Sequence, residues 1–134
     1  MSGKFDVKGD FLYTKDHEWA ASNAEGMVVG ITAYAVDQLG DITLVNLDVK
    51  AGDSVEAGKA FGTIESVKTL SDLFSPVSGK IVKVNSELES KPELVNEDCY
   101  GKAWMVTLET TDTSALSALL EPAAYAEHVK ASAH

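Results

Sequence analysis

Cysteine, proline and long apolar runs are all scarce in this chain of 134 residues. It has one cysteine, Cys99, and three prolines. A single thiol cannot close an internal disulfide, so the fold does not depend on an oxidising compartment. No apolar run approaches the ~20 residues that cross a bilayer, and residues 1–10 have neither a secretory hydrophobic segment nor an Arg-rich transit character. We therefore expect a cytosolic protein, or one whose presequence is missing, and no membrane partner.

Basic residues are also few. The chain has 11 Lys and Arg against 21 Asp and Glu, a formal net charge of −10. A phosphate backbone would be repelled, so nucleic acid is excluded as a partner. The charge is explained either by solubility or by steering toward basic faces of partner proteins, and the two are compatible. The ordinary content of 45% hydrophobic and 24% charged residues predicts a single folded domain over residues 1–134.

Short apolar or alternating stretches recur along the chain, with turn signals between them. The expected strands cover residues 18–21, 27–31, 42–47, 60–64, 80–84 and 104–108. This rhythm predicts a mainly β fold, either a sandwich or a flattened barrel. Residues 22–26 are expected to connect the first two strands as a hairpin, since Asn and Gly tolerate positive φ.

Two helical segments are expected. Thr32 can cap a short helix after the first hairpin, and Gly40 suits its C-terminal end. Residues 112–130 form the second, with a cap at residues 112–114 and a final turn that opens at Pro122. Residues 1–11 are expected to be an extended N-terminus.

A lysine stands between two glycine-containing turns. The first turn is GDSVEAG at residues 52–58, the second is SPVSG at residues 75–79, and Lys68 falls between two strand candidates. A lysine at a hairpin tip extends its flexible stem into water, where a modifying enzyme can reach it. Taken alone, Lys68 would be an ordinary solvated surface residue.

This combination resembles the biotinyl/lipoyl carrier family, in which turns of this kind flank a lysine that is acylated by the cofactor. Glu65-Ser66-Val67-Lys68 resembles the glycine cleavage H proteins, whereas biotin carriers usually place Met on both sides of the lysine. The motifs that extend the resemblance from residue 12 to residue 125 include YTKDHEW at 13–19, VGIT at 29–32 and ELVN at 93–96. The resemblance implies a biotinyl/lipoyl-type β-sandwich or flattened barrel (hybrid motif). Cys99 and residues 46–48 depart from the family pattern, which leaves local loop shape and partner affinity open.

The resemblance also implies a function. Lipoate would be attached covalently to Lys68 by a lipoate ligase or a lipoyl/octanoyl transferase that recognises Glu65, Ser66 and Val67. The carrier would accept the aminomethyl group of glycine from the PLP-dependent glycine decarboxylase (P protein) and pass it to the aminomethyltransferase (T protein). Dihydrolipoamide dehydrogenase (L protein) would then reoxidise the lipoyl group of the carrier. Such a chain is a carrier and not an enzyme, is expected to be a monomer, and works in the bacterial cytoplasm or, as a eukaryotic mature chain, in the mitochondrial matrix.

Two acidic residues have competing interpretations. By the resemblance, Glu18 and Asp72 lie at the cleft that shelters the aminomethylated arm, and carboxylates attract an ammonium strongly in a partly desolvated cleft. By residue type alone, both are surface charges. His17-Glu18 does not predict a metal site, because the second histidine of a His-Glu-x-x-His motif is replaced by Ala21.

Three other functions remain open from the sequence. A lipoyl-relay protein, which hands its lipoyl group to 2-oxoacid dehydrogenases, would use the same Lys68. A lipoyl domain of those dehydrogenases fits less well, because such modules are shorter, have an Asp-Lys-Ala type tip and lack an N-terminal extension like that around Trp19. An unmodified β-sandwich adhesion module would leave the whole set of motifs to chance.

Overall fold

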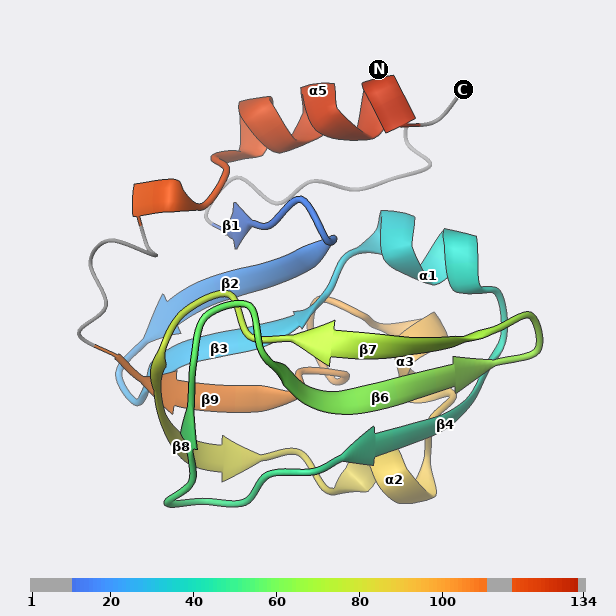
Figure 1. The fold of residues 1–134 in the computed structure, drawn as a ribbon. Helices are drawn as coiled ribbons and strands as arrows, with labels where there is room; N and C mark the ends of the chain where they lie inside the picture. The colour runs from blue at the N-terminus through green and yellow to red at the C-terminus, as the bar shows by residue number, and fades with distance from the viewer. Residues whose placement is uncertain (1–10, 111–116, 133–134) are drawn as a thin grey trace.

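Two antiparallel sheets form the protein, and they lie face to face (Figure 1). The computed structural model describes residues 11–110 and 117–132. Within these ranges, one sheet has the strand order β1-β2-β3-β9-β8-β5 and the other has the order β4-β6-β7. The strands are β1 (Leu12–Tyr13), β2 (Glu18–Asn23), β3 (Gly26–Ile31), β4 (Ile42–Leu47), β5 (Ser54–Val55), β6 (Ala60–Ser66), β7 (Leu70–Phe74), β8 (Gly79–Val84) and β9 (Val106–Glu109). The predicted mainly β sandwich is confirmed.

All six predicted strands are present, as β2, β3, β4, β6, β8 and β9. Strand β9 begins at Val106, two residues later than predicted, and β2 and β3 form the expected hairpin. The sequence prediction missed β1, β5 and β7. Strand β7 directly follows Lys68, yet Leu73 is its only fully buried residue, so the alternation that marks a half-buried strand is weak there. The hairpin that carries the lysine is therefore formed by β6 and β7.

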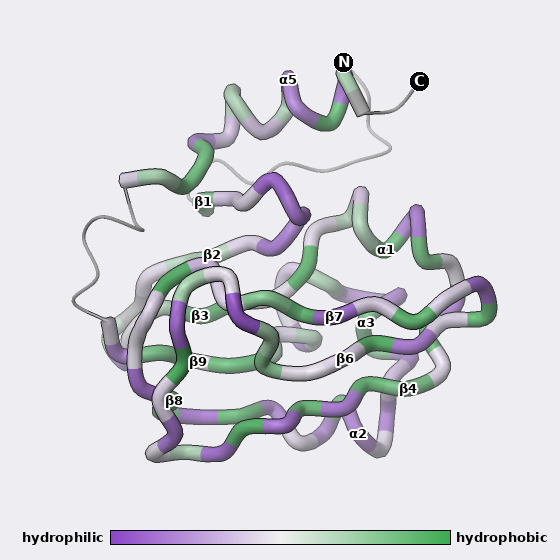
Figure 2. The backbone as a smooth tube through the Cα atoms, viewed as in Figure 1, coloured by the Kyte–Doolittle hydropathy of each residue, from purple (hydrophilic) through white to green (hydrophobic). Residues whose placement is uncertain are grey.

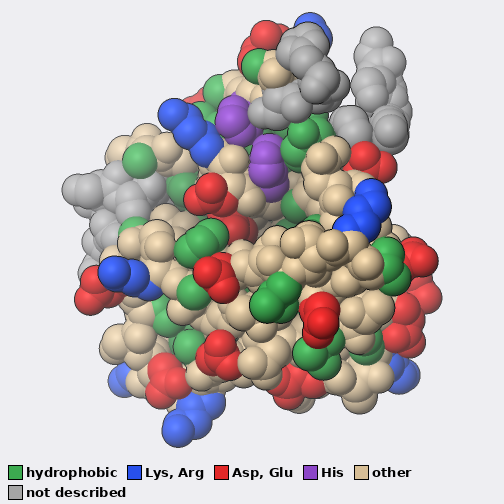
Figure 3. Space-filling model, turned by 45° about the vertical axis from the view of Figure 1, so that its right-hand side comes forward, with side chains coloured by type: hydrophobic (Ala, Val, Ile, Leu, Met, Phe, Trp, Pro, Cys, Tyr) green, Lys and Arg blue, Asp and Glu red, His purple; other side chains and the backbone are tan. Residues whose placement is uncertain are grey.

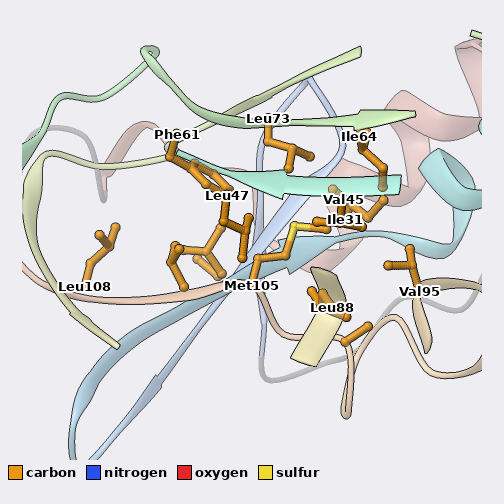
Figure 4. Close-up of a cluster of buried hydrophobic side chains, with 14 of the residues drawn as sticks. Ile31, Val45, Leu47, Phe61, Ile64, Leu73, Leu88, Val95, Met105 and Leu108 are labelled. Carbon is orange, nitrogen blue, oxygen red and sulfur yellow. The ribbon is translucent and has the colours of Figure 1, made fainter. Parts of the chain in front are cut away.

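The main hydrophobic core fills the space between the two sheets. Its side chains come from both layers and from two short helices, and include Ile31, Val45, Leu47, Phe61, Ile64, Leu73, Leu88, Val95, Met105 and Leu108 (Figure 4). Alternate residues of each strand point inward because successive side chains of a strand face opposite sides. Burying each large apolar side chain stabilises the fold by about 1.5–3 kcal/mol.

The helices are α1 (Ala33–Leu39), α2 (Glu87–Ser90), α3 (Leu94–Glu97) and α5 (Pro122–Ser132). As predicted, the Thr32 hydroxyl caps α1 by accepting a hydrogen bond from the Ala35 amide, and Gly40 ends the helix with φ of +80°. The single-turn helices α2 and α3 were not predicted. They are too short to show a helical period.

The C-terminal helix α5 covers Pro122–Ser132, so it begins at the residue that was predicted to open only the final turn of a helical region over residues 112–130, and it ends two residues beyond the predicted limit. Leu120 is not helical and instead pairs with Tyr13 in an antiparallel bridge. The predicted cap at residues 112–114 and the extended N-terminus, except Phe11, lie outside the described residues. Among the described helices, none is long and apolar enough to cross a membrane.

A second, aromatic cluster attaches α5 to the sandwich. The rings of Tyr13 and Tyr125 stack with centroids 4.4 Å apart, and Trp19, Tyr34 and Val129 complete the cluster. Helix α5 consequently lies above β1 and close to the loop that leads into β2 (Figure 1). The aromatic cluster thus brings the C-terminal helix α5 next to the segment that contains His17 and Glu18.

Candidate functional site

Lys68 lies at the exposed bend between β6 and β7, part of which is purple (hydrophilic) in Figure 2. Ser66 organises this bend from the end of β6. Its hydroxyl accepts hydrogen bonds from the Lys68 and Thr69 amides, both at 3.2 Å, while its own amide donates to the Thr69 carbonyl at 2.8 Å. The buried Ser66 side chain therefore gives the tip a defined backbone shape while Lys68 stays exposed.

The lysine tip is also held from the neighbouring strand. The Val67 amide donates to the Asp41 carbonyl at 3.0 Å, and the Thr43 hydroxyl donates to the Glu65 carbonyl at 3.1 Å. These bonds attach both sides of Ser66 to the segment where β4 begins. The predicted recognition residues Glu65, Ser66 and Val67 thus lie in one short hairpin with Lys68.

The side chains around Lys68 are open to solvent. Val67 is 67% exposed and Leu70 is 63% exposed, so two apolar side chains face solvent on either side of Lys68. Within the described ranges, the Lys68 ammonium makes no ion pair. Its amine is therefore accessible to an acylating enzyme, which is the property that covalent attachment of lipoate requires.

A pocket of about 170 Å³ opens beside this hairpin, and we call it the Glu18 pocket. It lies between α1, the loop that precedes β2, and the strands β6 and β7. Its lining residues are Asp16, His17, Glu18, Ile31, Ala35, Gln38, Leu39, Ile64, Ser71, Asp72 and Leu73. Lys68 is not among them, but Ser71 follows it by three residues, about 10 Å of extended chain. The structure thus brings Glu18 and Asp72, 54 residues apart in sequence, to one pocket.

Glu18 is buried, with 3% of its surface exposed, so its interpretation as a surface charge was wrong. One carboxylate oxygen accepts from the Thr14 hydroxyl at 2.7 Å and the other from the Phe74 amide at 3.3 Å. Burial raises the pKa of Glu18 to about 7, although both hydrogen bonds favour the charged form. Asp72, by contrast, is exposed, in agreement with its interpretation as a surface charge. The pocket therefore has one buried acid and one solvated acid.

His17 forms another wall of the Glu18 pocket. Its backbone has φ of +70°, which is uncommon for a residue with a Cβ. Its Nδ1 lies 2.9 Å from the Tyr125 hydroxyl, and that hydroxyl lies 2.7 Å from Thr32 Oγ1. Burial lowers the pKa of His17, and the nearby His128 lowers it further. Figure 3 shows two histidine side chains together on this face, with acidic side chains near them.

His17, Thr14 and Tyr125 were not predicted as site residues. Tyr125 lies 108 residues after His17 in the sequence, and no spacing links them. The positive φ of His17 follows from its turn, in which its amide donates to the Thr14 carbonyl and its carbonyl accepts from the Thr32 amide. Only the position of His17 in the motif at residues 13–19 could have drawn attention to it.

A larger hollow of about 290 Å³ shares no lining residue with the Glu18 pocket. Four of its ten lining residues are aromatic: Phe11, Trp19, Tyr100 and Trp104. Lys83 crosses it, 5.6 Å from the centre of the Trp104 ring and in a 2.7 Å ion pair with Glu25. It contains no residue of the lysine hairpin, so we place the candidate site at Lys68 and the Glu18 pocket.

Comparison with known proteins gives matches along almost the entire chain. The family model for the glycine cleavage H-protein matches residues 11–132. A glycine cleavage system H protein of Staphylococcus epidermidis is 49% identical over 123 residues, which are 92% of this chain and 97% of that protein. One from Anaeromyxobacter sp. (strain K) is 45% identical over 125 residues, 93% of this chain and 97% of that protein. The crystal structure of a glycine cleavage system H protein from Mycobacterium marinum matches with a TM-score of 0.82 and 38% identity, covering 90% of this chain and 97% of that chain.

Proposed function

Because the chain belongs to the glycine cleavage H-protein family, we propose that it is a lipoyl carrier, with lipoate joined by an amide bond to Lys68. The observation that carries the proposal is the position of Lys68, on an exposed but hydrogen-bonded hairpin tip beside the Glu18 pocket. The cargo is the aminomethyl group of glycine, received from glycine decarboxylase (P protein) and delivered to the aminomethyltransferase (T protein). Dihydrolipoamide dehydrogenase (L protein) then restores the oxidised carrier.

The chain itself supplies presentation and shelter. The bound lipoyl group would supply the reactive sulfurs, so the protein needs no nucleophile or general base of its own. Ser66 and Asp41 fix the backbone on both sides of Val67, so that Lys68 is presented in one orientation. A carrier that visits three enzymes in turn is expected to be a monomer, and the bacterial relatives support a location in the cytoplasm.

The Glu18 pocket is suited to an amine-bearing cargo. Glu18 and Asp72 offer carboxylates to an ammonium. The pKa of the buried Glu18 is about 7, so a bound ammonium would favour its ionised form, and the attraction to that form is strong because the group is desolvated. The lowered pKa of His17 keeps its imidazole neutral near pH 7, so it does not repel a cation in the same pocket. Apolar side chains of Ile31, Leu39 and Leu73 limit the access of water. Exclusion of water protects a carbon bound between sulfur and nitrogen from hydrolysis.

Attachment can be tested directly on the purified chain. A lipoate ligase with lipoate and ATP should add one lipoyl group, which intact mass and peptide mapping should locate at Lys68. Lys68→Arg should gain no mass. Lys59→Arg, which changes another exposed lysine, should be modified like the parent. Modification of the Lys68→Arg chain, or none of the parent, would contradict the proposal.

A further inference from the structure

The ELVN motif at residues 93–96 has no part in the proposed function, yet its last residue reaches the segment beneath Lys68. Asn96, in α3, donates from Nδ2 to the Gly40 carbonyl at 3.0 Å. Its Oδ1 accepts from the Ile42 amide at 2.9 Å. One side chain therefore bridges residues 40–42, the connection between α1 and β4.

This connection supports the lysine tip. The carbonyl of Asp41, the residue between the two Asn96 contacts, accepts the hydrogen bond from the Val67 amide at 3.0 Å. A Cβ added at Gly40 would lie 3.4 Å from Lys68 Cε, so the lysine stem runs over this glycine. Residues 40–42, which Asn96 bridges, thus contact both the backbone next to Lys68 and the side-chain stem of Lys68.

Helix α3 is a firm base for this contact. Val95, the residue before Asn96, is completely buried and packs in the core between the sheets (Figure 4). Asn96 itself is exposed, so its side chain contributes little to the core. A continuous path of contacts therefore leads from the core through Asn96 to the tip that carries Lys68.

We propose that Asn96 is a positioning residue for the acylation of Lys68, a role that rests on the proposed function. In the acylation step, the uncharged Lys68 amine attacks the carbonyl carbon of a lipoyl adenylate. The amide bond forms as the bond between that carbon and the adenylate oxygen breaks, and AMP and a proton are released. Asn96 touches none of these atoms. It holds residues 40–42, and through them the tip, in the shape that the acylating enzyme binds.

The test compares Asn96→Ala with a matched asparagine variant. Asn85 also makes two side-chain bonds to backbone, from Nδ2 to the Lys102 carbonyl at 3.0 Å and to the Trp104 carbonyl at 2.7 Å. It is more buried than Asn96, with 7% exposed, and contacts no residue of the tip through these bonds. Asn85→Ala should therefore destabilise the fold more than Asn96→Ala does, but leave acylation unchanged.

Acylation kinetics with a purified lipoate ligase should separate the two variants. In Asn96→Ala we expect kcat/KM to fall roughly five- to thirty-fold, the equivalent of one or two lost hydrogen bonds. The loss should appear mainly as a rise in KM, because a hairpin tip without the support of Asn96 must be ordered when the enzyme docks. Amide hydrogen exchange should accelerate at Val67, whose partner is Asp41, and less at Ser66, whose partner lies within the hairpin.

Two results would overturn the assignment while leaving the proposed function intact. One is acylation of Asn96→Ala with parental kcat/KM. The other is an equal loss in Asn85→Ala, which would show that general destabilisation is responsible. A parent chain that is not acylated at all would overturn the proposed function, and the role of Asn96 with it.

Discussion

Replacing Glu18 with Gln should remove a pH-dependent loss of stability. Burial raises the pKa of Glu18 from its ordinary value of 4.5 to about 7. Between these values the folded chain retains a proton that the unfolded chain has released, so the free energy of unfolding falls as the pH rises. The contribution of protonated Glu18 to the free energy of unfolding is fully present below pH 4.5 and is lost as the pH rises through 7. The difference between the pKa of about 7 in the folded chain and the ordinary value of 4.5 corresponds to about 3 kcal/mol of unfolding free energy.

Urea unfolding at pH 5 and pH 8, followed by the fluorescence of the two tryptophans, Trp19 and Trp104, measures this effect. Relative to Glu18→Gln, the parent should lose about 2–3 kcal/mol between the two pH values. Gln leaves one of the two hydrogen bonds of Glu18 unmade, at a cost of about 1 kcal/mol that does not vary with pH. Asp72→Asn is the matched control, because it removes an exposed carboxylate from the same pocket. Parallel pH profiles for the parent and Glu18→Gln would refute the reasoning.

Two further substitutions test the packing around the site. Tyr125→Phe removes the hydroxyl shared by His17 and Thr32 and should cost about 1–3 kcal/mol of unfolding free energy, with a shift of the His17 imidazole NMR signals. Unchanged His17 signals would contradict that contact. Gly30→Ala would place a Cβ 2.6 Å from the buried Trp19 ring, so we expect a loss of about 1–3 kcal/mol by overpacking. A parental midpoint in thermal unfolding would contradict the close approach.

The sequence predicts those parts of the fold that have a local signal. The cap at Thr32 and the stop at Gly40 define α1, because both act within one helical turn. Strand β7 lacked such a signal, since of its five residues only Leu73 is fully buried and Leu70 is exposed. Pairing with β6 decides its conformation, and strand pairing cannot be seen in a five-residue segment.

The candidate site likewise has parts that could be predicted from the sequence and parts that could not. Lys68 and its hairpin are contiguous in sequence and could be recognised there, and the position of Glu18 in its motif indicated the cleft. The burial of Glu18 could not be predicted from residue type, which favours exposure for a carboxylate. The contacts of Tyr125 with His17 and of Asn96 with Gly40 join segments that are 108 and 56 residues apart. Only the folded structure brings these pairs together.

The most direct test of the proposed carrier role is glycine-dependent exchange of labelled bicarbonate, with a purified glycine decarboxylase and the chain lipoylated beforehand. We expect exchange with the lipoylated parent and none with an identically treated Lys68→Arg chain. A parent that is fully lipoylated by mass, yet inert with a matched decarboxylase, would contradict it. Such a chain would be a lipoyl protein with a different task, and transfer of its lipoyl group to a 2-oxoacid dehydrogenase would be the next activity to measure.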